Sequence, residues 1–196
     1  MYPFNDQVFI IAELSANHNN DFDLAVDTIK AMAKAGANAV KVQTYTADSL
    51  AINVDNDIFG KRKEGLWKGR TLWDLYKEAS MPYEWHEPLQ KVAQELGLVF
   101  FSSPFDVDGV AFLEQLNVPL YKIASFEITD IPLIRAVAKT GKPIIISTGV
   151  AQEADISLAL ETCHRENNHQ VTLLKCTSNY PSTLADANLT TMADMR

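Results

Sequence analysis

The sequence contains no long hydrophobic run and few positive charges. Its longest apolar stretches, such as 143–148, have the length of a β-strand and are too short to cross a bilayer. Lysine and arginine number 17 against 25 aspartates and glutamates, so the formal net charge is −8. Nucleic acids and anionic membranes bind basic surfaces, and we therefore expect neither as a partner. The chain also opens without a charged-then-apolar signal segment, so we expect a cytoplasmic protein.

Cysteine is scarce as well, and a nucleotide-binding glycine pattern is missing. The two cysteines, Cys163 and Cys176, have no metal-binding or redox spacing, and we expect no disulfide between them in a reducing compartment. Cys176 lies in an apolar run, which predicts a buried, unreactive side chain. No Gly-x-Gly-x-x-Gly pattern follows any apolar run, and its absence weakens a dinucleotide-binding interpretation.

One pattern recurs along the chain: a short apolar run, a polar turn and then an amphipathic segment. The runs are rich in β-branched or aromatic residues, which is typical of strands buried on both faces of a parallel sheet. The amphipathic segments have helical periodicity, and several end at a glycine. The predicted strands are Val8–Glu13, Ala39–Tyr45, Leu98–Phe105, Leu120–Ser125, Pro143–Gly149 and Val171–Ser178. The predicted helices are Leu24–Ala35, Glu84–Leu96, Val107–Leu116, Ile131–Thr140 and Ile156–Glu166.

This alternation of strand and helix predicts an α/β fold, for which two architectures compete. One is an open, doubly wound sheet, and the other is a closed (β/α)8 TIM barrel. Polar or charged residues lie within or at the end of nearly every predicted strand. A barrel gathers all strand carboxyl ends into one mouth, where such residues form a single site, so we favour the barrel.

A long connection at 46–82 interrupts the pattern. It contains Trp67, Trp73 and Tyr76 and a helical stretch at 71–80. Long loops inside compact domains are usually either functional or disordered, and these aromatic residues favour an ordered, functional loop.

Polar residues are concentrated where the first predicted strand ends. The segment 13–20 (ELSANHNN) contains Glu13, Asn17 and His18, more functional groups than a plain turn needs. The structural alternative is a surface turn that caps the following helix. Since Glu13 still belongs to the strand, where it would face other strand ends, we interpret the segment as part of a site.

Lysines occur inside two predicted strands. Lys41 and Gln43 are two residues apart and therefore share one side of the second strand. A lysine inside a barrel needs an anionic partner or ligand. An ion pair with Glu13 and an anion site both meet that need, and the two can coexist. Lys122 has the same requirement on the fourth strand.

Hydroxyl groups accompany these lysines at the strand ends. Ser103 ends the third strand, Ser125 and Glu127 follow Lys122, and Ser147 ends the fifth strand. Ammonium groups flanked by hydroxyls and backbone amides suit a phosphate or a carboxylate. A Schiff-base lysine, as in a class I aldolase, is the alternative, but anion binding explains more of the pattern.

The four histidines do not form a metal site in this interpretation. Only His18 is expected at the mouth of the barrel. We expect His86, His164 and His169 on the outside or at the bottom, so the chain alone would not build a histidine-rich metal centre.

Six stretches spread in order over essentially the whole chain resemble one known family. They are FIIAE with NHN at 9–19, VKVQT at 40–44, FSSPF at 101–105, YKIAS at 121–125, ISTG at 146–149 and LKCTSNYP at 174–181. They resemble the N-acetylneuraminate (sialic acid) synthase family. Segments 43–46, 71–76 and 83–86 look most similar to the pseudaminic acid synthase branch. The next alternative within the family is a legionaminic or neuraminic acid synthase.

The resemblance implies an architecture and a reaction. Residues 1–196 would be a partial TIM-barrel catalytic domain, with the last barrel strands and an antifreeze-like domain following Arg196. Phosphoenolpyruvate would attack the aldehyde of an open-chain N-acetylated amino-sugar, which a divalent metal (Mn²⁺ or Mg²⁺) polarises, and inorganic phosphate would leave. The metal ligands would lie beyond this chain, and the full-length protein would be a homodimer.

The resemblance also implies roles for individual residues. The candidate catalytic residues are Glu13, Lys41, Gln43 and Lys122. The candidate substrate-binding residues are Asn17, His18, Ser103, Ser125, Glu127, Ser147, Ser178 and Tyr180. Ser178 is a departure, because the sialic acid branch has asparagine there.

These observations leave three candidate functions. The first is a sialic-acid-type synthase, with this chain inactive on its own for want of metal ligands. The second is a non-catalytic fragment that retains only the phosphoenolpyruvate half-site, and the third is a class I aldolase. We expect the first, and the sequence does not fix the acceptor sugar.

Overall fold

The structure, a computed structural model, describes residues 8–65, 67–179 and 182–195. These residues form two compact units, which divide between Phe101 and Ser102. The strands follow one another in the sheet order β1-β2-β3-β4-β5-β6. Strand β3 (Val99–Pro104) begins in the first unit and ends in the second, and each unit is described by itself.

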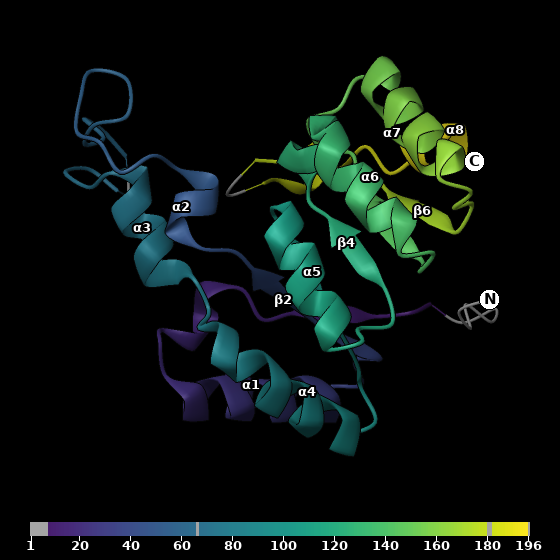
Figure 1. Ribbon diagram of the computed structural model, residues 1–196, viewed down its shortest axis with the longest axis horizontal. Helices are drawn as coiled ribbons and strands as arrows, with labels where there is room; N and C mark the ends of the chain where they lie inside the picture. Colours follow the sequence, from purple (N-terminus) through teal and green to yellow (C-terminus); the bar gives the residue numbers. More distant parts are fainter. Residues whose placement is uncertain (1–7, 66, 180–181, 196) are drawn as a thin grey trace. The chain divides into compact units, whose positions relative to one another are not determined.

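The first unit is built on two parallel strands. Strand β1 (Ile11–Glu13) pairs with β2 (Ala39–Thr44) in a register that places Glu13 opposite Lys41. Helix α1 (Phe22–Lys34) connects them, and α4 (His86–Glu95) lies beside it (Figure 1). The core contains Ile29, Val40 and Leu89, all fully buried. Two short 3-10 helices complete the unit, η1 (Ala16–His18) after β1 and η2 (Tyr83–Trp85) before α4.

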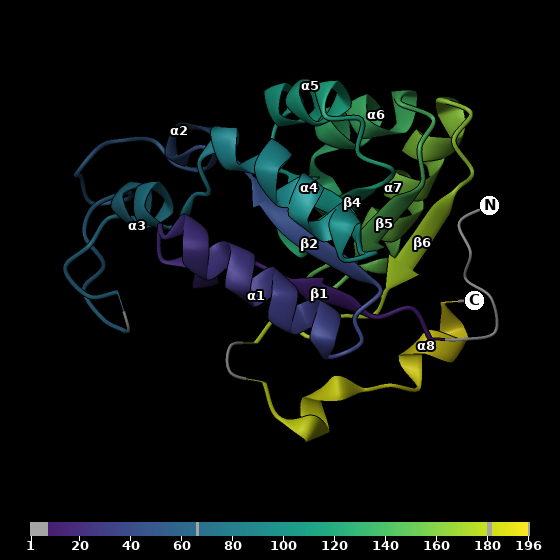
Figure 2. The same cartoon turned by 90° about the horizontal axis from the view of Figure 1, so that it is seen from below.

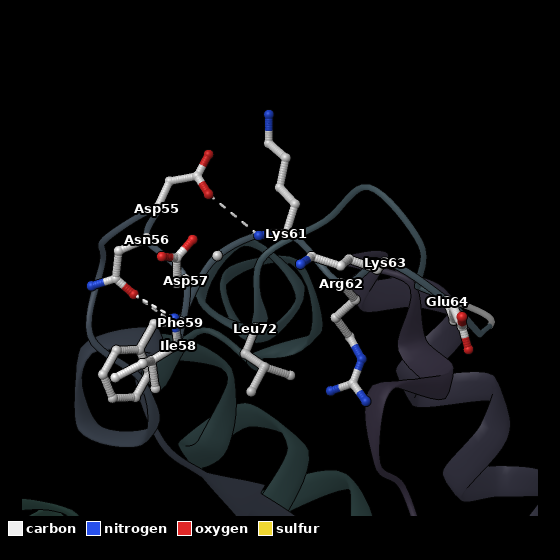
Figure 3. Close-up of a pocket in the computed structure, with 11 residues that line it drawn as sticks. Asp55, Asn56, Asp57, Ile58, Phe59, Lys61, Arg62, Lys63, Glu64 and Leu72 are labelled. Carbon is white, nitrogen blue, oxygen red and sulfur yellow. Dashed lines mark hydrogen bonds between the residues drawn. The ribbon is translucent and has the colours of Figure 1, made fainter.

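Where the structure describes it, the long connection of the first unit contains two helices and a pocket lined by residues 55–64 and Leu72 (Figure 3). It contains α2 (Ala47–Leu50) and α3 (Leu72–Ala79), which pack against each other. The indole N–H of Trp73 donates to Asp48 Oδ1 at 2.8 Å, and the Tyr45 and Tyr76 rings meet edge to face. The predicted helix at 71–80 is confirmed, whereas the pattern gave no sign of the four-residue α2.

The second unit continues the same alternation. Strands β4 (Tyr121–Ile123), β5 (Ile144–Ser147) and β6 (Val171–Leu174) are parallel. Helices α5 (Val107–Gln115), α6 (Ile131–Lys139) and α7 (Glu153–Arg165) lie side by side in that order (Figures 1 and 2). The 3-10 helix η3 (Ser125–Thr129) follows β4, while η4 (Leu184–Ala187) and α8 (Thr191–Asp194) follow β6. Its core includes Leu113, Ile123 and Ile134.

The predicted strands and helices are confirmed, with differences at their ends. Helix α7 begins at Glu153, three residues before the predicted start, because the Asp155 carboxylate accepts the Gln152 backbone N–H at 2.9 Å and caps the helix. Cys163 and Cys176 are free thiols, as expected. Within the described ranges, no helix has both the length and the apolar character needed to cross a membrane.

The core of the first unit makes a stability prediction. We expect Ile29→Ala to lower the free energy of unfolding by about 2–5 kcal/mol, because it opens a cavity at a fully buried position. Leu24→Ala on the same helix is the control, with an expected loss below about 1 kcal/mol, because Leu24 is exposed. Urea unfolding followed by circular dichroism measures both. Equal losses would contradict the assignment of Ile29 to the core.

Candidate active site

An ion pair marks the strand ends of the first unit. Lys41 Nζ lies 2.6 Å from Glu13 Oε1 across the β1–β2 pair, with the lysine side chain 10% exposed and the glutamate 45%. The alternative of a Glu13–Lys41 ion pair is therefore confirmed. An ammonium group has three N–H donors, so the pair does not use up the binding capacity of Lys41. The half-exposed carboxylate places this pair where solvent, or a ligand, can reach it.

Gln43 lies two residues further along β2, on the same side as Lys41. Its side-chain Oε1 accepts the hydroxyl of Ser15 at 2.9 Å. Because Ser15 holds the oxygen of the amide, the NH2 group is directed away from Ser15 and can serve as a donor. The turn after β1 thus orients a candidate catalytic side chain on β2.

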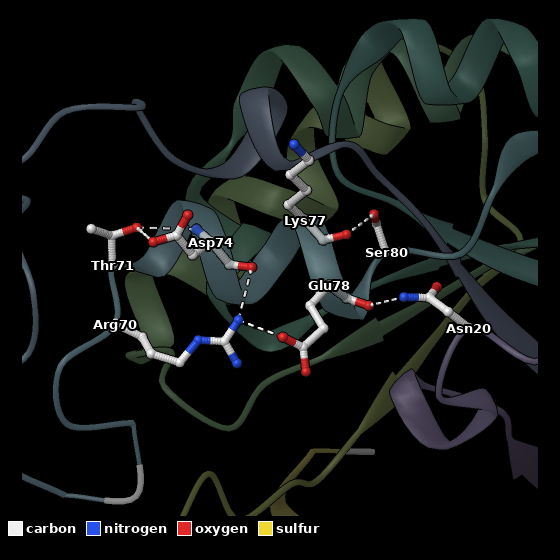
Figure 4. Close-up of polar contacts among 7 residues, drawn as sticks. All are labelled: Asn20, Arg70, Thr71, Asp74, Lys77, Glu78 and Ser80. Atoms are coloured by element: carbon white, nitrogen blue, oxygen red, sulfur yellow. Dashed lines mark hydrogen bonds and ion pairs between the residues drawn. The ribbon is translucent and has the colours of Figure 1, made fainter.

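His18 on η1 is almost fully buried. Its Nδ1 accepts the backbone N–H of Asn20 at 3.0 Å, whereas the buried Nε2 has no hydrogen-bond partner. Burial lowers the pKa of His18, which favours the neutral ring with its proton on Nε2. Asn17 is exposed on the same turn. The Asn20 side chain donates to the carbonyl of Glu78 at 2.7 Å, which ties this turn to α3 (Figure 4).

The expectation that His86 lies on the outside or at the bottom is wrong. His86 is fully buried, and its Nε2 lies 2.8 Å from the Thr44 hydroxyl at the carboxyl end of β2. A helix that follows a parallel strand begins near that strand's carboxyl end, so the first residues of α4 belong to this edge. His164 and His169 are exposed at the end of α7 and just before β6, as expected.

Lys122 is the central cation of the second unit. It is 7% exposed, and its Nζ donates to Ser147 Oγ at 2.5 Å and to the Ile123 carbonyl at 2.8 Å. Ser147 ends β5, the strand paired with β4. A buried ammonium flanked by a hydroxyl and a carbonyl is suited to holding an anion.

Glu127 on η3 carries a second buried ionisable group. Its Oε2 is buried without a hydrogen-bond partner. Burial raises the pKa of Glu127, and the Lys122 ammonium partly opposes that shift. A carboxyl group with a raised pKa is suited to proton transfer near neutral pH.

Hydroxyl groups crowd the backbone at Gly149, directly after β5. The Gly149 N–H donates to Ser125 Oγ at 3.3 Å. A Cβ at this position would lie 3.0 Å from Ser125 Oγ and would collide with Ser178 Oγ, so the close approach requires glycine. Cys176 Sγ lies 3.2 Å from Ser147 Oγ. The expectation of a fully buried Cys176 is wrong, because the residue follows the end of β6 and is half-buried beside the hydroxyl cluster.

Ser103 adds a fourth hydroxyl-bearing residue in the second unit. It is 1% exposed, and its Oγ has no hydrogen-bond partner. Among the described residues, His18 Nε2, Ser103 Oγ and Glu127 Oε2 are the buried side-chain polar atoms without partners. All three belong to the predicted site. Each unpaired buried polar group costs about 1–3 kcal/mol, so their retention points to ligands that satisfy them.

The structure thus assembles the predicted residues in two sets, one in each unit. The first set contains Glu13, Gln43, Lys41, Asn17 and His18, and the second contains Ser103, Lys122, Ser125, Glu127, Ser147 and Ser178. That both sets serve one substrate stays a prediction. Tyr180 lies outside the described residues. In the described ranges, no three His, Cys, Asp or Glu side chains are arranged to hold a metal ion, so these residues do not fit a divalent metal centre.

Comparison with known proteins gives one family. The model of the NeuB family matches residues 28–196. The chain is 47% identical to a pseudaminic acid synthase of Helicobacter pylori, over 95% of this chain and 54% of that protein. It is 48% identical to a pseudaminic acid synthase of Campylobacter jejuni, over 93% of this chain and 53% of that protein. The chain therefore spans about half the length of the curated relatives it matches.

A solved structure gives the fold. The crystal structure of an N-acetylneuraminic acid (sialic acid) synthetase from Leptospira borgpetersenii, in complex with citrate, matches with a TM-score of 0.82 and 34% identity. The match covers 96% of this chain and 60% of that one. It confirms the predicted fold class, an α/β chain with six units of the (β/α)8-barrel type.

The buried carboxyl group predicts a pH-dependent stability. Because the folded-state pKa of Glu127 is raised, its contribution to stability is present below the unfolded pKa and is lost as pH rises. We expect Glu127→Gln to be more stable than the unmodified protein at pH 7.5 and equally stable at pH 4. Urea unfolding at both values measures this.

Glu87→Gln is the matched control. The hydrogen bond to Lys91 lowers the pKa of Glu87, so the sign is reversed and the substitution should not stabilise the protein at pH 7.5. A Glu127→Gln protein that is less stable than the parent at pH 7.5 would show that the carboxylate is satisfied in the fold.

Proposed function

The chain belongs to the NeuB family, and we propose that it forms the phosphoenolpyruvate-binding part of a sialic-acid-type synthase. The proposed reaction joins phosphoenolpyruvate to an N-acetylated amino-sugar and releases inorganic phosphate. Identities of 47% and 48% to pseudaminic acid synthases support the pseudaminic acid branch. This chain would be the first part of a catalytic domain with the barrel fold.

One observation carries this proposal, the pairing of Lys122 with Ser147 at the carboxyl ends of two adjacent strands. A buried ammonium held in place by a hydroxyl is suited to a phosphate or carboxylate oxygen. Ser125, Gly149 and Ser178 converge next to Ser147 in the same unit. These donors match a small, doubly anionic ligand better than a neutral one.

In the proposed mechanism the protein supplies charge and orientation. Lys122 and Lys41 would neutralise the phosphate and carboxylate, and the serine hydroxyls would fix the plane of the enol. C3 of phosphoenolpyruvate would form the new bond to the aldehyde carbon of the open-chain sugar. Water would add at C2, and phosphate would leave by cleavage of the C2–O bond. Glu13 and Gln43 would face the sugar, and Glu127 would lie close enough to Lys122 to exchange a proton at the edge of the site.

The remaining parts of the proposal concern the longer protein. A divalent metal, Mn²⁺ or Mg²⁺, would polarise the aldehyde when bound to the longer protein, since the described residues do not fit such a centre. The likeness to the family supports a homodimeric, cytoplasmic full-length protein. The acceptor would be a 2-acetamido or 2,4-diacetamido sugar.

Phosphate release by the full-length protein that carries this chain tests the reaction. We expect release only when phosphoenolpyruvate and the correct amino-sugar are both present. Lys122→Met should lower kcat/KM by about 10²-fold or more, because a preorganised charge is removed from the reacting anion. Lys91→Met on the exposed face of α4 is the control and should leave the rate unchanged. Release without a sugar, or trapping of a keto acid on Lys122 by borohydride, would contradict a synthase.

The reactivity of the two cysteine thiols gives a separate test of phosphoenolpyruvate binding. Cys176 is half-buried beside Ser147, whereas Cys163 is fully buried and burial raises its pKa to about 11. We expect a thiol reagent to label Cys176 alone in the native chain, and phosphoenolpyruvate to slow that labelling. Lys122→Met should abolish the protection and Lys91→Met should keep it. Rapid labelling that phosphoenolpyruvate does not slow would count against this site.

A further inference from the structure

The turn before α4 contacts the carboxyl end of β2 through a buried histidine. His86 Nδ1 lies 3.2 Å from the carbonyl oxygen of Tyr83, and its Nε2 lies 2.8 Å from the Thr44 hydroxyl. The ring also interacts with the backbone carbonyl of Gln43. His86 therefore holds the last two residues of β2 in one orientation.

The neighbouring residue of the same turn contacts the other strand end. The Trp85 ring meets the His18 ring edge to face, with centroids 5.5 Å apart, and meets Phe22 of α1 in the same way. Trp85 packs against the core of the first unit. Two successive residues, Trp85 and His86, thus support the turn after β1 and the end of β2.

We infer that the Tyr83–His86 turn is a positioning element for the catalytic residues of the first unit, and that His86 is its positioning residue for Lys41 and Gln43. The inference rests on the proposed synthase reaction and adds a role that the matched motifs do not assign. His86 acts through Thr44 and the Gln43 backbone, and touches no reacting atom itself.

The physical reason is the rigidity that a satisfied buried polar contact provides. Lys41, Gln43 and Thr44 lie on one short strand, so a change in the direction of its end moves both candidate catalytic side chains. A displacement of about 1 Å at a reacting group costs on the order of 10²-fold in rate. Burial lowers the pKa of His86 to about 4, so the ring stays neutral and its contact with Thr44 is the same throughout the neutral range.

Other charged groups near this histidine do not alter that state. From its own segment Glu84 faces His86 and tends to raise its pKa, yet the effect of burial is larger. From β2 the Thr44 hydroxyl and the Gln43 backbone face the ring, and from the same turn the aromatic ring of Tyr83 lies against it.

Two substitutions in the full-length protein test the contact between Thr44 and His86, one at each residue. Thr44→Val removes the hydroxyl without changing the shape of the side chain, and His86→Leu removes the ring nitrogen that the hydroxyl contacts. We expect each to lower kcat for phosphate release by about 10-fold to 10²-fold with a change in KM for phosphoenolpyruvate below about threefold. The double variant should match the single variants, since one contact is lost in all three.

Controls separate positioning from general damage. His86→Gln, which can offer an amide group toward Thr44, should recover part of the rate. His169→Leu, at an exposed histidine in the second unit, should be fully active. Additive losses in the double variant, or full activity of Thr44→Val, would overturn the inference.

A measurement without turnover distinguishes failure of this inference from failure of the proposed function. The side-chain amide signals of Gln43 in NMR spectra should shift in Thr44→Val and His86→Leu and stay in place in His169→Leu. Unchanged signals would overturn the positioning role whatever the reaction. Shifted signals in a protein that releases no phosphate would sustain the positioning of Gln43 and reject the synthase.

Discussion

Burying ammonium groups at the ends of parallel strands is the constraint on which the candidate site depends. Moving a charge out of water costs several kcal/mol unless other groups compensate it. The two lysines are compensated differently. Lys41 has a carboxylate at 2.6 Å from the adjacent strand, whereas Lys122 uses the Ser147 hydroxyl and the Ile123 carbonyl. A carboxyl group also interacts with Lys122, because burial raises the pKa of Glu127 and the Lys122 ammonium opposes that rise. Each buried lysine is thus accompanied by a carboxyl group, and Lys122 has the hydroxyl and carbonyl contacts in addition.

Each unit also keeps buried polar atoms that the fold leaves unsatisfied. His18 Nε2, Ser103 Oγ and Glu127 Oε2 each lie buried without a partner. At about 1–3 kcal/mol per group, such atoms consume a substantial part of the 5–15 kcal/mol that typically separates folded from unfolded states. Selection for stability alone would replace them with apolar residues or provide partners. Ser103 lies on β3, and His18 and Glu127 lie on the 3-10 helices that follow β1 and β4, where a trade of stability for binding is expected.

Much of this arrangement followed from the sequence, because its causes are local or periodic. Short apolar runs between amphipathic segments predicted the six strands and five of the helices, and the two-residue period placed Lys41 and Gln43 on one side of β2. The errors came from contacts between segments distant in the chain. The helical pattern alone predicts an outer position for His86, although a helix that follows a parallel strand begins close to the carboxyl edge of that strand. The apolar neighbours of Cys176 predict a buried side chain. Its contact with Ser147 on β5 is seen only in the structure. Helix α2 is too short to show a period, and the reciprocal hydrogen bonds of Thr46 and Ser49 cap its first turn.

The position of His86 shows how such a site is supported. In a parallel α/β unit, the segment after a strand ends must leave the carboxyl edge and return as a helix, so the residues between them are held close to that edge. In the first unit the segment from Tyr83 to His86 contacts both strand ends. In the second unit Ser125, which opens η3 directly after β4, accepts the Gly149 N–H after β5. Each time, the residue that orients a strand end comes from the start of a helical turn, where backbone direction is already fixed by the first hydrogen bonds. Substrate-facing residues are recognisable as polar positions within strands, whereas their supports occupy helix starts and look like ordinary caps in the sequence. Ser125 could still be named from the sequence, because it follows Lys122 closely at the end of β4, whereas His86 is 42 positions away from Thr44 and could not.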